Sequence, residues 1–251
     1  MVYGFMNTML VIKKNNMNKF QYSNGEFEIN NVPQSVYDDF NNFIFASEIR
    51  VFAKLAARMF LYNKIKNIPG DIVECGVYKG SGLLSWLKLK KTFSPNLLRK
   101  IIGFDMFDQE KLLETLVDDD KLKMQALFKN RNFKYSNYRS ILHNQISQAG
   151  FTDADFELIE GDVSITSKDF VDKRPGFKIA LLYLDMDIEQ PTYDALNNFW
   201  ERMSVGGIVV FDEYAHHQWS ESKAVDRFVK ENNLELKSLH FDAPTAYIKK
   251  I

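Results

Sequence analysis

Lys178-Ile-Ala-Leu-Leu-Tyr-Leu-Asp185 is the stretch of sequence that decides the fold. Its unbroken apolar run, between a lysine and an aspartate, predicts a strand buried on both faces. Four similar runs, at 71–77, 100–105, 156–162 and 206–212, are separated by segments that include helical patterns. Strands that alternate with helices predict an α/β fold, in which helices cover both faces of a parallel sheet.

Two further predicted strands, 234–241 and 246–250, close the chain around Asp242-Ala-Pro244. A hairpin-like ending adds an antiparallel strand, so we expect a seven-stranded, mostly parallel sheet. Between the second and third strands, residues 107–152 form a long, charged and aromatic insertion with helical patches. A connection of that length is typical of a lid over a site, and the alternative is a helical decoration that covers the sheet.

The N-terminal part carries a different pattern. Residues 13–31 are rich in Asn and Lys, which is typical of a loop or arm. Between residues 36 and 65, apolar side chains that include Phe52, Leu55 and Met59 recur at helical spacing and predict one or two amphipathic helices. Their apolar surface can pack on the sheet or on a second copy of the chain, which would make a homodimer. We divide the chain into 1–68, the N-terminal arm and helices packed on the core, and 69–251, the main domain.

Composition excludes several classes of protein. The 251 residues carry a formal net charge of −1, which gives no reason to expect nucleic acid as a partner. Cys75 is the single cysteine, so an intramolecular disulfide and a cysteine-rich zinc site are excluded. The apolar stretch at 6–12 is too short to span a bilayer. We therefore expect no membrane partner and take the cytoplasm as the location.

The carboxyl ends of the predicted strands carry the candidate site, because open parallel sheets bind ligands at that edge. The first strand runs into a loop with Gly76, Gly80 and Gly82, where the backbone can approach a ligand closely before a helix begins. This spacing differs from the G-x-G-x-x-G pattern of dinucleotide-binding proteins. The alternative is a tight strand-to-helix turn that binds no ligand.

Acidic residues end the next two strands. Asp105 ends the second, where α/β nucleotide-binding folds use an acid to accept hydrogen bonds from ribose hydroxyls. The alternative for Asp105 is a solvated loop residue. Asp162 ends the third strand, where a carboxylate can accept from an exocyclic amine such as that of adenine.

The densest acidic feature follows the fourth and fifth strands, which we expect to be neighbours. Asp185 and Asp187 follow one strand, and Asp212 and Glu213 follow the other. Carboxylates this close repel one another unless a cation or protons compensate, and Mg²⁺ prefers oxygen ligands. We predict a divalent metal here. The alternative is that Asp187 and Glu213 face solvent and a single acid does chemistry.

These residues together resemble the macrocin O-methyltransferase (TylF-type) family, over most of the chain from about Phe43 to the end of the last helix. Each matching segment is short, but their combined order and spacing are specific. The segments are 70–80, 102–107, 161–163, 184–192, 206–214 and 224–226.

The resemblance implies a Rossmann-like class I methyltransferase that uses S-adenosylmethionine and Mg²⁺ to methylate a sugar hydroxyl of a small-molecule acceptor, such as a glycoside, a nucleotide sugar or a natural product. The implied metal ligands are Asp185, Asp212 and Glu213, with Asp187 as a neighbour, and the family usually has an aspartate where this chain has Glu213. The implied cofactor-binding residues are Glu74, Gly76, Tyr78, Gly80, Ser81, Asp105, Asp162, Val163 and Asp185.

The implied reaction is an in-line transfer of a methyl group from a sulfonium to a hydroxyl oxygen, with the protein aligning donor and acceptor. Asp185 or His216 would take the proton, and His217 is a further candidate base or substrate ligand. The insertion at 107–152 would close over the acceptor. The alternatives are N-methylation of an amino sugar, methylation of a phenol, an NAD-dependent oxidoreductase, and a nucleotide-binding domain without catalysis.

Overall fold

The computed structural model describes residues 28–29, 32–131 and 136–251. Most of the predicted arm, residues 13–27, and the apolar stretch at 6–12 lie outside these residues. The chain divides into two compact units, Met1–Ile49 and Arg50–Ile251. In the first unit, two short antiparallel strands, β1 (Glu28–Ile29) and β2 (Val32–Pro33), precede helix α1 (Gln34–Ile44). Among the described helices, none is long and apolar enough to cross a bilayer.

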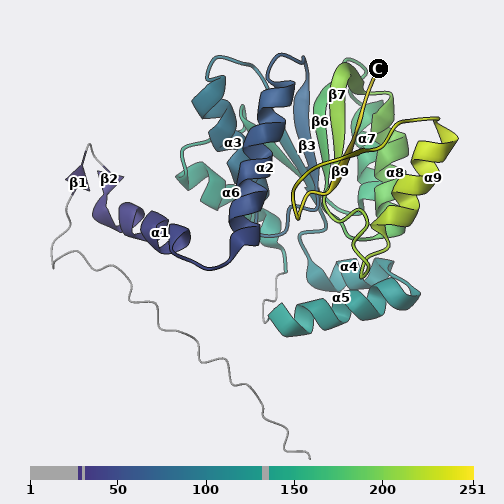
Figure 1. Cartoon of the computed structure of the whole chain (residues 1–251), viewed down its shortest axis with the longest axis horizontal. Helices are drawn as coiled ribbons and strands as arrows, with labels where there is room; N and C mark the ends of the chain where they lie inside the picture. Colours follow the sequence, from purple (N-terminus) through teal and green to yellow (C-terminus); the bar gives the residue numbers. More distant parts are fainter. Residues whose placement is uncertain (1–27, 30–31, 132–135) are drawn as a thin grey trace, which may run out of the picture. The chain divides into compact units, whose positions relative to one another are not determined.

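A seven-stranded sheet forms the centre of the second unit (Figure 1). Its strands are β3 (Asp71–Cys75), β4 (Ile101–Asp105), β5 (Phe156–Glu160), β6 (Ile179–Leu184), β7 (Met203–Phe211), β8 (Lys237–Ser238) and β9 (Ala246–Lys249). Their order in the sheet is β5-β4-β3-β6-β7-β9-β8. The first five of these strands run parallel, and β9 lies antiparallel between β7 and β8. The predicted α/β fold and its antiparallel ending are confirmed.

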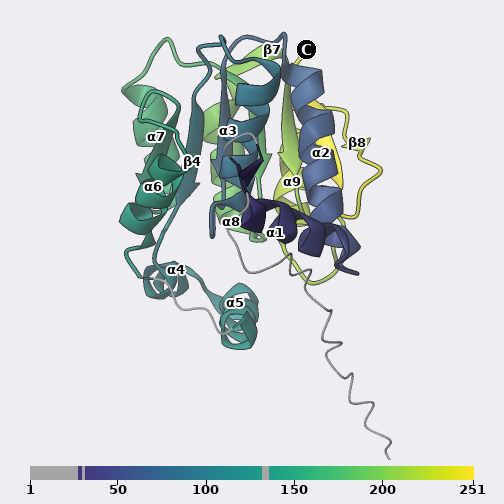
Figure 2. The same cartoon turned by 90° about the vertical axis from the view of Figure 1, so that its left-hand side faces the viewer.

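Helices cover both faces of the sheet (Figures 1 and 2). One face packs against α2 (Ile49–Ile65), α3 (Ser81–Phe93) and α6 (Tyr138–Gln148), and the other against α7 (Val163–Asp172), α8 (Glu189–Trp200) and α9 (Glu221–Glu231). Successive side chains of a strand point to opposite faces, so a strand between two helical layers is apolar throughout. In β6, Leu181 and Tyr183 join the first core, and Leu182 and Leu184 join the second.

Helix α2 turns a different face toward the sheet from the one its apolar periodicity suggests. Phe52, Leu55 and Met59 are 47%, 39% and 43% exposed, respectively. The face that packs on the sheet is determined by residues further along the helix, because Leu61 and Tyr62 belong to the core. The buried face of α2 includes one charged residue, Arg58. Its buried side chains are Ala57, Arg58, Leu61, Tyr62 and Ile65.

The predicted insertion at 107–152 contains α4 (Gln109–Thr115), α5 (Asp118–Arg131) and α6 in its described residues. Helix α6 buries Leu142 and Ile146 in the first core, as the decoration alternative predicts. Helices α4 and α5 instead lie beyond the end of the sheet (Figure 2). They contribute to a separate apolar cluster that includes Met124 and Phe128. The insertion is therefore divided between the main core and a separate cluster beyond the end of the sheet, and the lid stays a prediction.

Candidate active site

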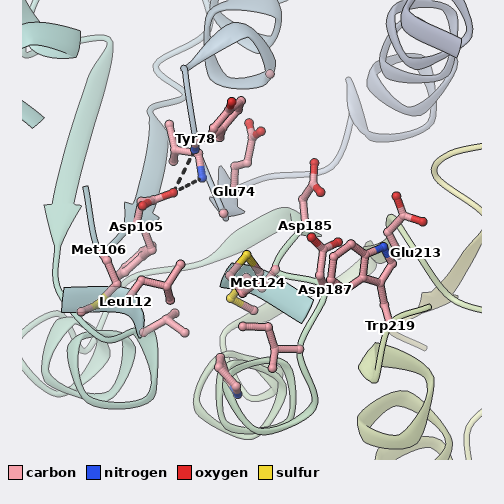
Figure 3. Close-up of a pocket in the computed structure, with 18 of the residues that line it drawn as sticks. Glu74, Tyr78, Asp105, Met106, Leu112, Met124, Asp185, Asp187, Glu213 and Trp219 are labelled. Carbon is pink, nitrogen blue, oxygen red and sulfur yellow. Dashed lines mark hydrogen bonds between the residues drawn. The ribbon is translucent and has the colours of Figure 1, made fainter. Parts of the chain in front are cut away.

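A cavity of about 380 Å³ lies where the parallel strands end and α4 and α5 begin. Helices α4 and α5 supply an apolar wall, which includes Leu112 and Met124, and the strand ends supply the polar wall (Figure 3). Gly80, Asp212 and His216, which belong to the predicted site, do not line the cavity. The predicted residues that do line it are Glu74, Gly76, Tyr78, Ser81, Gly82, Asp105, Asp162, Val163, Asp185, Asp187 and Glu213.

Asp105 shapes the loop that follows β3. Its Oδ2 accepts hydrogen bonds from the backbone N–H groups of Val77 and Tyr78 at 2.8 and 2.9 Å (Figure 3). Its Oδ1 accepts a hydrogen bond from the backbone N–H of Phe107 at 2.8 Å. Burial raises the pKa of Asp105, and the backbone donors oppose that shift. The carboxylate therefore folds the glycine loop against the end of β4, a role that the sequence pattern does not reveal.

Two glycines in this loop are required by close approaches. Gly76 has a φ of +90°, and a Cβ added there would lie 1.9 Å from the carbonyl oxygen of Asp185. Gly80 has a φ of +86° and precedes α3, where an added Cβ would lie 2.4 Å from a methyl carbon of Leu142. Both positions combine a left-handed backbone with a lack of space, which only glycine tolerates.

Asp162 begins the next helix as well as lining the cavity. Its Oδ1 accepts a hydrogen bond from the backbone N–H of Ser164 at 2.9 Å, so it is the N-cap of α7. Val163, the first residue of α7, lies beside it in the cavity wall. The predicted adenine-side residues thus lie at a helix N-terminus that opens on the cavity.

Glu74 forms a buried ion pair with Arg58. Its Oε1 lies 3.6 Å from Nη2 of Arg58, and the guanidinium carbon lies 5.7 Å from the ring centre of Trp86 and 5.0 Å from that of Tyr183. Burial raises the pKa of Glu74 to about 7, although the charge of Arg58 opposes that shift. Sequence reasoning missed Arg58, because a charged residue in an amphipathic helix is assigned by default to the solvent face.

Lys54 lies among the acids that follow β6 and β7. Its Nζ is 2.6 Å from Oδ2 of Asp212 and 3.8 Å from Oδ2 of Asp185, and Asp212 also accepts a hydrogen bond from the hydroxyl of Tyr183. Burial acts to lower the pKa of Lys54, but Asp185 and Asp212 outweigh it and raise the pKa to about 12. Burial, together with the charge of Asp212, raises the pKa of Asp185 well above its usual range. Sequence reasoning also failed to assign Lys54 to the site.

The three predicted metal ligands do not form one donor set. Asp212 is fully buried, and both of its oxygens have donors. Glu213 Oε2 lies 3.8 Å from Nδ1 of His216, which itself lies outside the cavity. Within the described part of the chain, no three His, Cys, Asp or Glu side chains are grouped to hold a metal ion. This arrangement does not fit a divalent ion, and the cation that it contains is Lys54.

A further acid, Glu221, lies behind Glu213. It is fully buried at the start of α9, and its Oε1 accepts a hydrogen bond from the backbone N–H of Glu213 at 3.2 Å. Burial, with the charge of Asp187, raises the pKa of Glu221 well above its usual range. Glu221 therefore fixes the backbone beside the cavity, and sequence reasoning missed it because a glutamate in a first helical turn is ordinary.

A hydrogen-bonded contact joins α5 to the strand ends. The hydroxyl of Ser220 donates to Oδ2 of Asp120 at 2.8 Å and accepts from the backbone N–H of Glu189 at 2.9 Å. The backbone N–H of Ser220 donates to the carbonyl of Asp187 at 3.1 Å. Ser220 thus connects the wall made by α5 with the loops after β6 and β7.

Comparison with known proteins identifies the family of this chain. The model of the macrocin-O-methyltransferase (TylF) family matches residues 56–250. The chain is similar to the 8-demethyl-8-(2,3-dimethoxy-alpha-L-rhamnosyl)-tetracenomycin-C 4'-O-methyltransferase of Streptomyces olivaceus, at 26% identity over 59% of this chain and 54% of that protein. It is also similar to the demethyldecarbamoylnovobiocin O-methyltransferase of Streptomyces niveus, at 24% identity over the same shares. The match spans about half the length of these curated relatives.

Among solved structures, the apo form of a TDP-rhamnose 3'-O-methyltransferase of calicheamicin biosynthesis has the same fold. Its TM-score is 0.64 at 26% identity, over 85% of this chain and 86% of that chain. The family model extends from the middle of α2 to the last strand, and so includes every strand end described above. The chain belongs to the macrocin O-methyltransferase (TylF) family.

Proposed function

We propose that the protein is an S-adenosylmethionine-dependent O-methyltransferase that acts on a sugar hydroxyl of a small-molecule acceptor. The observation that carries the proposal is the cavity at the strand ends, where the loop held by Asp105 and the acid Asp162 face Asp185 and Glu213 across one space. Family membership supports it, and two relatives are named for rhamnosyl or rhamnose substrates. A glycoside or nucleotide sugar is therefore the proposed acceptor.

The proposed cofactor site follows the strand ends in order. Glu74 and Gly76 lie at the methionine end, Asp105 at the ribose and Asp162 at the adenine. Tyr78, Ser81 and Val163 complete the surface through the glycine loop and the start of α7, and Gly80, which does not line the cavity, shapes the loop behind it. The left-handed backbone at Gly76, which lines the cavity, supports this assignment, because it allows main chain to approach a ligand closely.

S-adenosylmethionine supplies an electrophilic methyl group on a sulfonium. Asp185 accepts the proton that the acceptor hydroxyl releases as its oxygen takes up the methyl group, and the carbon–sulfur bond breaks. Asp185 is favoured over His216 as the base because Asp185 lines the cavity. The wall made by α4 and α5 excludes water from the acceptor.

Binding of Mg²⁺ stays a prediction from the sequence, and the proposed proton transfer to Asp185 involves no metal. N-methylation of an amino sugar is the second candidate. The ammonium of Lys54, 3.8 Å from Asp185, disfavours a protonated amine at that position and so favours a hydroxyl acceptor.

Isothermal calorimetry with S-adenosylmethionine and with NAD tests the cofactor. We expect binding of the first and none of the second, and the reverse would contradict the proposal. Mass spectrometry then follows methyl transfer to TDP-rhamnose, rhamnosyl glycosides and matched amino sugars. Methylation confined to amino groups would refute the hydroxyl acceptor while leaving the cofactor assignment intact.

A further inference from the structure

The ammonium of Lys54 occupies a specific place among the acids of the site. It lies 2.6 Å from Asp212 and 3.8 Å from Asp185, two residues that the sequence predicts to bind metal. Lys54 also lines the cavity, whereas Asp212 is fully buried behind it. One positive charge therefore stands between a buried carboxylate and the space proposed for the acceptor.

Asp212 has no carboxylate oxygen without a donor. Its Oδ2 accepts from Nζ of Lys54, and its Oδ1 accepts from the hydroxyl of Tyr183. Each of these oxygens keeps a second lone pair, but a divalent ion placed between Asp212 and Asp185 would compete with Lys54, whose ammonium contacts both acids. Displacing Tyr183 would leave a fully buried hydroxyl unpaired, and displacing Lys54 would break its contacts with both Asp212 and Asp185. Each exchange opposes metal binding.

Helix α2 fixes the position of this charge. Leu61 and Tyr62 anchor the helix in the core, and Arg58, four residues after Lys54, pairs with Glu74 at the end of β3. Positions four apart lie on the same side of a helix, so α2 presents two cations to acids on neighbouring strands. Unlike a bound ion, the ammonium of Lys54 is covalently tethered to α2 beside these acids.

We propose that Lys54 is the resident cation of the acceptor site and takes the place of the divalent metal. This role of Lys54 rests on the proposed function. It makes Lys54 a positioning residue, which neutralises Asp212 and orients Asp185 toward the acceptor hydroxyl. Methyl transfer then needs no divalent metal. A metal ion binds between Asp185 and Asp212 only when the Lys54 side chain is removed.

Titration of the chelator-treated full chain with Mn²⁺, followed by electron paramagnetic resonance, tests this without an acceptor. We expect the wild type to leave Mn²⁺ free and Lys54→Met to bind it at least about tenfold more tightly. The double variant Lys54→Met, Asp185→Asn should lose that gain. Lys66→Met, which removes an exposed lysine just after α2, should match the wild type. Equal Mn²⁺ binding by wild type and Lys54→Met overturns the proposal.

Turnover and cofactor binding give independent readouts. The wild type should keep its rate in excess EDTA, and a loss that Mg²⁺ restores overturns the proposal. Lys54→Met should lose turnover and recover part of it with Mg²⁺, whereas Lys54→Arg, which keeps a cation, should bind no Mn²⁺. If circular dichroism shows that Lys54→Met is unfolded, two other measurements test the role of Lys54: wild-type turnover in EDTA and Mn²⁺ binding by Lys54→Arg. Absence of S-adenosylmethionine binding by the wild type refutes the proposed function, whereas Mn²⁺ binding beside intact cofactor binding refutes only the role of Lys54.

Discussion

The guanidinium of Arg58 lies 3.6 Å from the carboxylate of Glu74, and the two side chains are only 8% and 2% exposed. This pair joins α2 to the end of β3 at the wall of the cavity. Because both side chains are almost fully removed from solvent, each charge is stabilised mainly by the other and little by water.

Removing one partner should therefore cost much more than removing both. Arg58→Met leaves Glu74 buried without a counter-charge, so at a pH above 7, where the wild-type carboxylate is ionised, we expect a loss of about 3–5 kcal/mol in the free energy of unfolding. The double variant Arg58→Met, Glu74→Gln should recover a large part of that loss. Urea denaturation of the four proteins in the cycle measures the coupling, and additive losses would show that the pair is not coupled.

Stability should fall with rising pH through the titration of Glu74. Because its pKa in the folded protein is about 7 and its ordinary value is 4.5, the folded state binds more protons than the unfolded chain between these values. The free energy of unfolding therefore decreases as pH rises from about 4.5 to 7. Glu74→Gln should make this decrease smaller, as measured by urea midpoints across the range. A decrease of unchanged slope in the variant would contradict the assignment.

A methyl group at position 82 should disturb the same pair. A Cβ added to Gly82 would lie 2.1 Å from Oε1 of Glu74 and 2.6 Å from Nη2 of Arg58. We expect Gly82→Ala to lower the free energy of unfolding by about 1–3 kcal/mol. Gly176→Ala is the matched control, since an added Cβ there meets nothing within 4 Å. Equal stabilities of the two variants would disprove the crowding.

The contact between Ser220 and Asp120 should control how firmly α5 covers the cavity. Asp120→Ala removes an acceptor 2.8 Å from the Ser220 hydroxyl, a bond that contributes about 1 kcal/mol, so amide exchange in α5 should accelerate about fivefold. Asp119→Ala serves as the control because it removes an exposed acid from the same first helical turn. Hydrogen-exchange mass spectrometry compares the two, and similar exchange rates would exclude a role for the contact.

Asp185→Asn should separate catalysis from cofactor binding. The amide is nearly the same size but cannot accept the acceptor proton, so turnover should fall by about 10²–10⁴-fold. The dissociation constant for S-adenosylmethionine should change little. Asp172→Asn, at an exposed position on α7, controls for the loss of one negative charge. Full turnover by Asp185→Asn would require another base.

The strands and the acids that end them could be predicted from the sequence. Runs such as Ile179–Leu184 are apolar at every position, because both faces of a central strand are buried. Parallel strands bring their carboxyl ends to one edge, so the acids Asp105, Asp162 and Asp185 come together once the order of strands is known. These predictions rest on local pattern and topology alone.

The contribution of α2 could not be predicted in the same way. Apolar periodicity placed Phe52, Leu55 and Met59 on one face, but the helix turns Arg58 inward, where Glu74 compensates its charge. A partner at the end of a distant strand leaves no trace in the helical pattern. Helix α7 was likewise not predicted, because polar residues interrupt its apolar ones.

The division of the insertion between the sheet and the cavity separates the part that the core needs from the part that lines the cavity. Helix α6 contributes Leu142 and Ile146 to the main core, so substitutions there would lower the free energy of unfolding of the whole domain. Helices α4 and α5 contact the cavity through side chains such as Leu112 and Phe128, in a cluster separate from the main core. Under the proposed function, we expect replacement of that short segment to change the acceptor while the proposed cofactor side and the sheet remain as they are.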